Sequence, residues 1–265
     1  MKGHLIDIGV NLTDKAFNNQ VETILHNAIE QRVDKFIITG TKLEEFPHAQ
    51  QLSEQFTDHC FFTVGIHPHY SKYWVEEYYE KLKAQAQHPK AVAIGETGLD
   101  YNRNFSEPHA QRHAFEQQLK LAGELQMPLF LHERDAHDDQ LTLLKRYRDD
   151  VPGGVTHCFT GNADELKHYL DLDLYIGITG WICDERRGQH LQELVKTIPL
   201  NRLLIETDAP YLLPRTLKPK PKSRRNEPAF LRHICEQVSA ILDMPSNELA
   251  DITTENAATL FNLNR

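Results

Sequence analysis

The sequence predicts an α/β fold of the (β/α)8 TIM-barrel type, in which parallel strands alternate with helices. Three observations favour this fold. Eight short apolar runs rich in β-branched residues recur along the chain, and helical patterns separate them. The runs are almost continuously apolar, which is typical of parallel strands buried on both faces. Their starts lie roughly twenty to forty residues apart, which leaves room for a strand, a loop and a helix.

The expected strands follow one another at regular intervals. We place them at Leu5–Val10, Phe36–Thr41, Phe61–His67, Ala91–Glu96, Pro128–His132, Gly154–His157, Leu174–Thr179 and Leu203–Asp208. The clearest helical pattern covers Glu107–Gln126, where Phe115 and Leu119 share one face and Pro108 stands in the first turn. No repeat, low-complexity tract or linker divides the chain, so we expect a single domain over residues 1–265.

A doubly wound open sheet is the main alternative fold. Such a sheet usually carries a glycine-rich phosphate turn after its first strand. The corresponding turn here reads Gly9-Val10-Asn11-Leu12, which is neither GxGxxG nor a P-loop. We therefore favour the barrel.

The composition is that of an ordinary globular protein with an acidic balance. Hydrophobic residues make up 40% and charged residues 25%, and the formal net charge is −9. Nucleic-acid binding would therefore need a local basic patch rather than a basic surface. No apolar run approaches a membrane span, and the start lacks the core of a signal peptide. The cysteines are scattered and form no CxxC pair, so we expect a reducing, cytoplasmic setting.

Ligand-type side chains stand at the ends of four expected strands. Glu96, His132, His157 and Asp208 each share parity with deeper apolar residues of their strand, as Ile94 does with Glu96. Alternate residues of a barrel strand point inward, so the terminal ones should meet at the C-terminal mouth. Imidazole and carboxylate groups at fixed positions can hold a divalent cation, and a nearby carboxylate can accept a proton from water.

Taken singly, these residues also have structural explanations. His132 or His157 alone suits a hydrogen-bonded core histidine, and Glu96 suits a buried acid paired with Arg134. The joint pattern of four such strand ends favours a metal site. Cys158 has the opposite parity to His157, so we expect it to face the helices and serve in packing.

A specific resemblance rests on five segments in the same order as in one known family. They are Gly65-Ile66-His67-Pro68-His69, Ala93-Ile94-Gly95-Glu96-Thr97-Gly98-Leu99-Asp100-Tyr101, His132-Glu133-Arg134-Asp135-Ala136, His157-Cys158-Phe159-Thr160-Gly161 and Glu206-Thr207-Asp208-Ala209-Pro210-Tyr211-Leu212. Together they resemble the TatD family of metal-dependent deoxyribonucleases, a branch of the amidohydrolase-like TIM barrels. The similarity extends over essentially the whole chain.

The resemblance implies both site roles and an activity. It implies metal binding at Glu96, His132 and His157, a ligand or proton-acceptor role for Asp208, and places near the site for His67 and His69. The implied activity is 3′-to-5′ exonuclease action on single-stranded DNA and RNA with Mg²⁺, or alternatively Mn²⁺, as cofactor. A link to repair of oxidative DNA damage is implied as well. We expect a monomer without an obligate protein partner.

The first strand departs from the family pattern. Most relatives carry a His-x-His pair there, but Gly9 and Asn11 occupy the two histidine positions in this chain. Both should point into the mouth. Two imidazoles are missing, and Asn11 offers only a neutral amide oxygen. We therefore expect a weaker, more hydrated site that suits Mg²⁺ or Mn²⁺.

A basic tract follows the last expected strand. Residues 215–225 contain no acidic residue, and prolines keep the tract extended. A solvated loop is the plain interpretation, but a cationic arm beside the mouth would guide phosphates, so we expect substrate contacts from Lys218, Lys220, Lys222, Arg224 and Arg225. Arg103 and Arg134 are further candidates for phosphate contact. Tyr101, Phe105, Trp181 and Tyr211 are candidates for stacking on bases.

Two other functions stay open at this point. One is a small-molecule amidohydrolase or esterase on the same barrel, although the absence of histidine at Gly9 and Asn11 argues against a strongly Lewis-acidic metal cluster. The other is a non-catalytic barrel that binds nucleic acid, which predicts binding that survives chelation.

Overall fold

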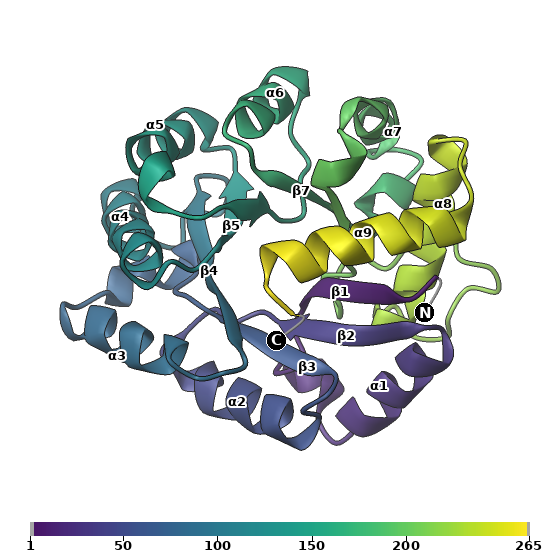
Figure 1. Cartoon of the computed structure of the whole chain (residues 1–265), viewed down its shortest axis with the longest axis horizontal. Coiled ribbons are helices and arrows are strands. Elements are labelled where there is room, and N and C mark those ends of the chain that lie inside the picture. Colours follow the sequence, from purple (N-terminus) through teal and green to yellow (C-terminus); the bar gives the residue numbers. More distant parts are fainter. Residues whose placement is uncertain (1–2, 264–265) are drawn as a thin grey trace.

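Eight parallel strands form one sheet in chain order, and helices surround it, in a computed structural model that describes residues 3–263 (Figure 1). The strands are β1 (Leu5–Val10), β2 (Val33–Ile38), β3 (Cys60–Val64), β4 (Ala91–Asp100), β5 (Leu129–Arg134), β6 (Gly154–Thr156), β7 (Tyr175–Ile178) and β8 (Leu203–Ile205). The α-helices are α1 (Val21–Glu30), α2 (Phe46–Gln55), α3 (Glu77–Ala86), α4 (Pro108–Leu125), α5 (His137–Tyr147), α6 (Ala163–Asp171), α7 (Gln189–Leu194), α8 (Leu231–Ile241) and α9 (Ser246–Leu260).

The first and last strands close the sheet into a barrel. Val10 bridges Ala209 in parallel, the Asp208 amide donates to Gly9 O at 2.9 Å, and the Asn11 amide donates to Ala209 O at 2.8 Å. These contacts lie just beyond the end of β8, so closure depends on the segment that carries Asp208. The predicted (β/α)8 barrel is confirmed.

Helix α9 seals the N-terminal end of the barrel. Thr254 Oγ1 donates to His4 O at 2.8 Å, and Asn256 Nδ2 donates to Leu203 O at 2.9 Å, at the starts of β1 and β8. Apolar residues of α9 and the segment after it complete the core inside the barrel, which comprises Ile6, Ile8, Ile37, Val92, Ala93, Phe130, Val155, Leu204, Ala257, Ala258, Phe261 and Leu263. A cavity that substrates can enter must therefore lie at the opposite, C-terminal end of the barrel.

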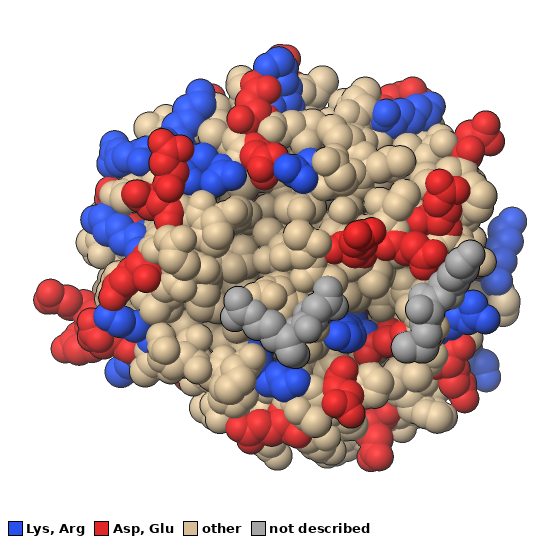
Figure 2. All heavy atoms as spheres, viewed as in Figure 1, with Lys and Arg blue, Asp and Glu red and all other residues tan. Residues whose placement is uncertain are grey.

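The sealed end carries charges of both signs. Figure 2 shows this face, where acidic and basic side chains are interspersed among uncharged residues. A second, larger core lies between the strands and the outer helices and includes Phe36 and Phe62 from the sheet and Phe115 and Leu119 from α4. The predicted helical pattern over Glu107–Gln126 therefore matches α4 closely.

Strand boundaries differ from the predicted ones at several places. β2 begins at Val33 rather than Phe36, and β3 ends at Val64 rather than His67. β4 continues to Asp100, four residues past the predicted end, because Gly98 and Asp100 still pair with β5. The sequence pattern missed this extension since polar and glycine residues form its last part.

Two strands change register near the mouth. Asp7 pairs with Phe36 and Val10 with Ile38, so β1 has one extra residue in this stretch. In β4, Gly95 pairs with Phe130 and Thr97 with Leu131, which leaves Glu96 as the extra residue of a bulge. Bulges of this kind redirect side chains and often adjoin functional sites.

None of the helices within residues 3–263 is both long and apolar enough to cross a membrane.

Candidate active site

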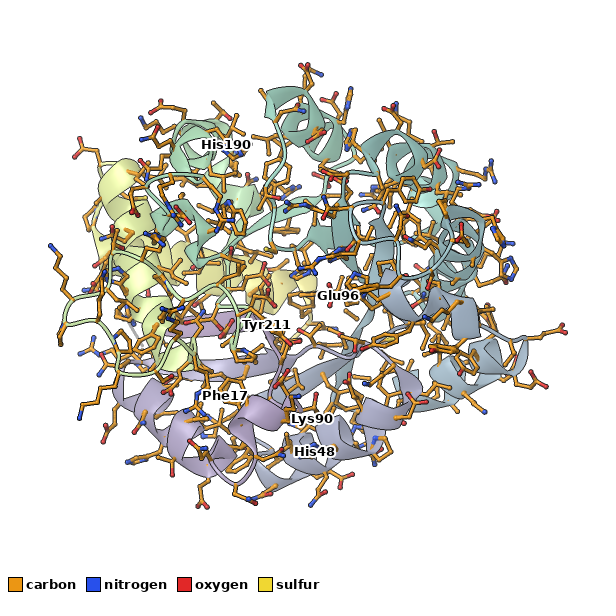
Figure 3. The ribbon with its side chains drawn as sticks, turned by 180° about the vertical axis from the view of Figure 1, so that it is seen from behind. Phe17, His48, Lys90, Glu96, His190 and Tyr211 are labelled. Carbon is orange, nitrogen blue, oxygen red and sulfur yellow. The ribbon has the colours of Figure 1, made fainter. Side chains whose placement is uncertain are left out.

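A polar cavity of about 970 Å³ opens at the C-terminal end of the barrel. Figure 3 views the molecule from this side and shows Glu96 near the centre of the barrel, with Tyr211 close by. The lining residues come from the ends of most strands and from the loops that follow them. Among them are His67, His69, Glu96, Asp100, Arg103, Arg134, His132, His157 and Asp208.

Glu96 occupies the centre of a histidine cluster. Its Oε1 atom lies 2.9 Å from Nδ1 of His132, 2.8 Å from Nε2 of His157 and 3.3 Å from Nε2 of His67. The bulge in β4 turns Glu96 into the mouth, and its amide donates to Gly40 O at 2.8 Å. Three histidines thus meet one oxygen of Glu96, with His132 on β5 and His67 and His157 just after β3 and β6.

His132 lies between two acids of β4. Its Nδ1 atom faces Glu96. On the other edge of the ring, Nε2 is 3.4 Å from Oδ2 of Asp100 and has no hydrogen bond to any described atom. Burial acts to lower the pKa of His132, but the Asp100 and Glu96 carboxylates outweigh it and raise the pKa to about 9. A cation could bind this imidazole only after a proton has left it.

The geometry of His67 fixes its tautomer. Its Nδ1 atom accepts from the His69 amide at 3.1 Å, so Nε2 carries the proton that faces Glu96. Burial lowers the pKa of His67 to about 4, which keeps the ring neutral. His67 therefore acts as a donor to Glu96 in this arrangement. His69 pairs with Asp100 instead, with Nε2 and Oδ2 2.7 Å apart.

Asp208 lies at the edge of the cluster and is held by the first strand. Asn11 Nδ2 donates to its Oδ1 at 3.0 Å. Burial, with the nearby Glu96 and Glu206 carboxylates, raises the pKa of Asp208 to about 7, although His157 opposes this shift. Asp208 is thus poised to exchange a proton near neutral pH.

The predicted phosphate-binding arginines line the cavity, whereas the basic tract does not. Arg103 and Arg134 are lining residues, and the Arg134 guanidinium lies 5.9 Å from the Trp181 ring centre. Lys218, Lys220, Lys222 and Arg224 are exposed on the loop after Tyr211 and are not among the lining residues. Arg225 is tied down, because it donates to Ala16 O at 2.6 Å and to Glu227 Oε1 at 2.7 Å.

The four candidate stacking residues have different surroundings. Trp181 and Tyr211 line the cavity. Phe105 is exposed and packs edge-on against His69, with ring centres 4.7 Å apart. The Tyr101 hydroxyl donates to Asp139 at 2.7 Å, outside the cavity.

The structure corrects the prediction for Cys158. Cys158 lines the cavity instead of facing the helices, and its Sγ atom lies 3.7 Å from Thr179 Oγ1. β6 ends at Thr156, and Cys158 has a φ of 47°, so the alternation of a strand no longer applies there.

Two acids that the site prediction left out belong to its structure. Asp100 contacts His69 and His132, and Glu206 contacts His157 with 3.4 Å between Oε2 and Nδ1. The extended β4 places Asp100 at the mouth. The strand parity of Glu206 with Asp208 was the available signal, but a buried acid below the mouth reveals its partner only in three dimensions.

The chain is similar to known proteins along nearly its whole length. The model of the family described as TatD related DNase matches residues 6–262. The chain belongs to this family. It is 51% identical over 259 residues to the 3′-5′ ssDNA/RNA exonuclease TatD of Citrobacter rodentium, with 98% of each chain covered.

Solved structures of the family share the whole fold. A hydrolase of the TatD family from Entamoeba histolytica superposes with a TM-score of 0.89 at 28% identity and covers 98% of this chain and 99% of its own. A TatD homologue from Escherichia coli K12 gives the same TM-score and identity, with 99% of both chains covered. The family and the cluster of His67, Glu96 and His132 indicate a divalent metal ion at this site.

Proposed function

We propose that this protein is a magnesium-dependent nuclease that removes nucleotides from the 3′ ends of single-stranded DNA and RNA. The observation that carries the proposal is the convergence of His67, His132 and His157 on one oxygen of Glu96, inside an open polar cavity. The relatives named as 3′-5′ ssDNA/RNA exonucleases, which match along nearly the full chain, support the substrate and the polarity.

The donor set fits a divalent cation. Glu96, His132 and His157 would hold it, because Nδ1 of His132 and Nε2 of His157 already lie 2.9 Å and 2.8 Å from Oε1 of Glu96. A bound cation supplies a Lewis acid that polarises the phosphoryl group and activates water. Protons on His132 would leave when the cation enters, since metal ligands must be deprotonated.

Asp208 would complete the site as a further ligand and proton acceptor. Its pKa of about 7 matches the requirement of a general base near neutral pH. The hydrogen bond from Asn11 holds one carboxylate oxygen and leaves the other for a proton. Glu96 has the complementary property, because the neighbouring His67 and His157 overcome the effect of burial and hold its pKa well below the usual range.

Phosphate and base contacts come from the rim of the cavity. Arg103 and Arg134 supply positive charge, and His69 supplies a ring nitrogen beside Asp100. Trp181 lines the cavity as a candidate for stacking on a base, and the Arg187 guanidinium lies 4.5 Å from its ring centre. The exposed lysines, Lys218, Lys220 and Lys222, extend this path outward, since the loop that carries them leaves the cavity at Tyr211 and Leu212.

Mg²⁺ suits the site better than a buried zinc ion. Gly9 contributes no imidazole, the amide of Asn11 is engaged with Asp208, and the ring of His67 already donates to Glu96. Oxygen ligands and access to water are what Mg²⁺ and Mn²⁺ favour. We also propose a cytoplasmic monomer that acts in repair of oxidised DNA. The free cysteines fit a reducing compartment.

Chelation followed by metal return tests the proposal against its rivals. Single-stranded oligonucleotides and a panel of small lactones and cyclic amides are incubated with protein treated with EDTA, then with added Mg²⁺, Mn²⁺ or Zn²⁺. We expect strand degradation that stops on chelation and returns with Mg²⁺ or Mn²⁺. Turnover of the small molecules alone would favour an amidohydrolase. Oligonucleotide binding that survives chelation without strand degradation would indicate a non-catalytic barrel.

A further inference from the structure

Glu206 is fully buried directly beneath the candidate active site. It comes just after β8, and the adjoining parts of β1 and β7 surround its carboxylate. We propose that Glu206 is a positioning residue that orients His157 for the cation, and that Gly9 and Gly177 exist to make room for its carboxylate. The proposal rests on the proposed function only in that the cation is taken to bind at His157.

Both oxygens of the Glu206 carboxylate face donors of the segment after β6. Oε2 lies 3.4 Å from Nδ1 of His157, and Oε1 accepts from the Cys158 amide at 2.6 Å. On the opposite side of the ring, Nε2 of His157 is 2.8 Å from Glu96. The ring of Phe130 stacks against His157 with centres 4.7 Å apart. The imidazole is therefore fixed on two edges and one face.

The carboxylate fills the space that two side chains would otherwise occupy. A Cβ atom added at Gly9 would lie 2.2 Å from Glu206 Oε2, and one at Gly177 would lie 2.6 Å from Oε1. Neither glycine has a φ in the left-handed region, so space rather than backbone conformation requires glycine there. This corrects the expectation that a side chain at position 9 would point into an open mouth, because Glu206 already fills that place.

The arrangement selects one nitrogen of His157 as the ligand. A buried carboxylate beside Nδ1 keeps the proton on that nitrogen and leaves the lone pair of Nε2 for the cation at Glu96. A glutamine at position 206 cannot replace it, since Nδ1–H of His157 and the amide of Cys158 are both donors and one amide oxygen serves only one of them well. Removal of such a partner typically costs roughly ten- to one-hundred-fold in metal affinity.

Calorimetric titration with Mn²⁺ tests the assignment without any nucleic acid. We expect Glu206→Gln to weaken Mn²⁺ binding by roughly ten- to one-hundred-fold. Gly9→Ala and Gly177→Ala should weaken it to a similar degree, although every carboxylate and imidazole remains. Gly123→Ala, on the outer helix α4, is the matched control and should bind like the parent. Thermal melting of each metal-free variant verifies the fold.

A double-mutant cycle separates positioning from a general weakening of packing. Removing the carboxylate with Glu206→Ala frees the space at Gly9, so the Gly9→Ala/Glu206→Ala variant should bind Mn²⁺ no more weakly than Glu206→Ala alone. Additive decreases in the cycle would overturn the glycine part of the proposal. Unchanged Mn²⁺ affinity in a folded Glu206→Gln variant would overturn the role of Glu206.

A proton NMR signal reads the contact independently of the cation. In the metal-free parent, the Nδ1–H proton of His157 should give a slowly exchanging downfield signal, identified by its absence from His157→Asn. We expect this signal to disappear in Glu206→Ala and to remain in Gly123→Ala. If the parent does not bind Mn²⁺, the cation at His157 and the metal part of the proposed function both fail, while the NMR signal still decides whether Glu206 holds the ring. Persistence of the signal in Glu206→Ala would overturn the contact itself.

Discussion

Nε2 of His157 lies 2.8 Å from Oε1 of Glu96, although Glu96 is on β4 and His157 follows β6, and these two strands are not neighbours in the sheet. The same oxygen is 2.9 Å from Nδ1 of His132. Burial acts to lower the pKa values of His132 and His157, but the neighbouring carboxylates outweigh burial and raise both. In the metal-free protein, protons on the two rings therefore balance the charge of the carboxylates. A cation that enters here must displace protons.

Cation affinity should therefore increase with pH. The pKa of His132 is about 9 and that of His157 is raised well above its usual range, so both rings are protonated at neutral pH and each metal ion bound releases a proton from each ring. We expect Mn²⁺ affinity to rise with pH between pH 6 and 9, by up to about tenfold per pH unit for each proton released. Calorimetry in buffers of different ionisation enthalpy counts the protons released. Affinity that is constant over this range would contradict the proton-exchange account.

Replacing one imidazole should stop hydrolysis without unfolding the protein. We expect His132→Asn to lower the rate by roughly 10²-fold or more, because the substituent cannot supply the missing ligand nitrogen. His113→Asn is the matched control, since His113 is exposed on α4. Initial rates on a single-stranded oligonucleotide and melting curves decide the outcome. Near-parental turnover in a folded His132→Asn variant would remove His132 from the site.

Asp208→Asn should lose most of its activity yet be more stable when metal is absent. The folded-state pKa of Asp208 is raised to about 7, so the ionised form is penalised and stability falls as pH rises from about 4 through 7. Asparagine avoids this penalty and can still accept from Asn11. We expect a gain of a few degrees in Tm at pH 8 that shrinks towards pH 4. A lower Tm at pH 8 would show that the Asp208 charge is stabilising.

The same substitution should alter the pH dependence of the reaction. A carboxylate accepts a proton only when it is deprotonated, so the parental rate should rise with pH through the pKa of Asp208. A bound cation lowers that pKa, so the rise should be centred at or below pH 7. We expect the residual rate of Asp208→Asn to lack this limb. An identical acid limb in both proteins would assign it to another group.

Positive charge inside the cavity and on the outer loop should act differently. Arg134→Gln should weaken oligonucleotide binding and lower kcat, because Arg134 lines the cavity. Joint replacement of Lys218, Lys220 and Lys222 by glutamine should weaken binding with little change in kcat, since these side chains are exposed outside it. Each phosphate that a lysine no longer neutralises should flatten the salt dependence of binding by about 0.7 in log-log slope. An unchanged slope in the triple variant would make this segment a plain solvated loop.

The sequence predicted the barrel, and the residues proposed as ligands lie together in one cavity, because both follow from local patterns. Strand periodicity and the polar residues at strand ends were sufficient to predict that Glu96, His132 and His157 lie in one cavity. The position of Asp100 depended on how far β4 continues to pair with β5, which local hydrophobicity does not encode.

The remaining differences have the same origin in three-dimensional packing. Cys158 turns into the cavity because the backbone leaves the strand before it. Gly9 was interpreted as a gap in the ligand set, but the space beside it is filled by Glu206, which lies 197 residues further along the chain. Arg225 stays a predicted substrate contact, and in the structure its guanidinium contacts Ala16 and Glu227.

Time courses on end-labelled strands test the central claim most directly. Single-stranded DNA and RNA labelled at the 5′ end are incubated with the parent, with and without Mg²⁺, and with His132→Asn. We predict a ladder that shortens stepwise from the 3′ end for the parent with Mg²⁺ only. Intact strands for the parent with Mg²⁺, or equal degradation by His132→Asn, would contradict the assignment of a metal-dependent exonuclease to this site.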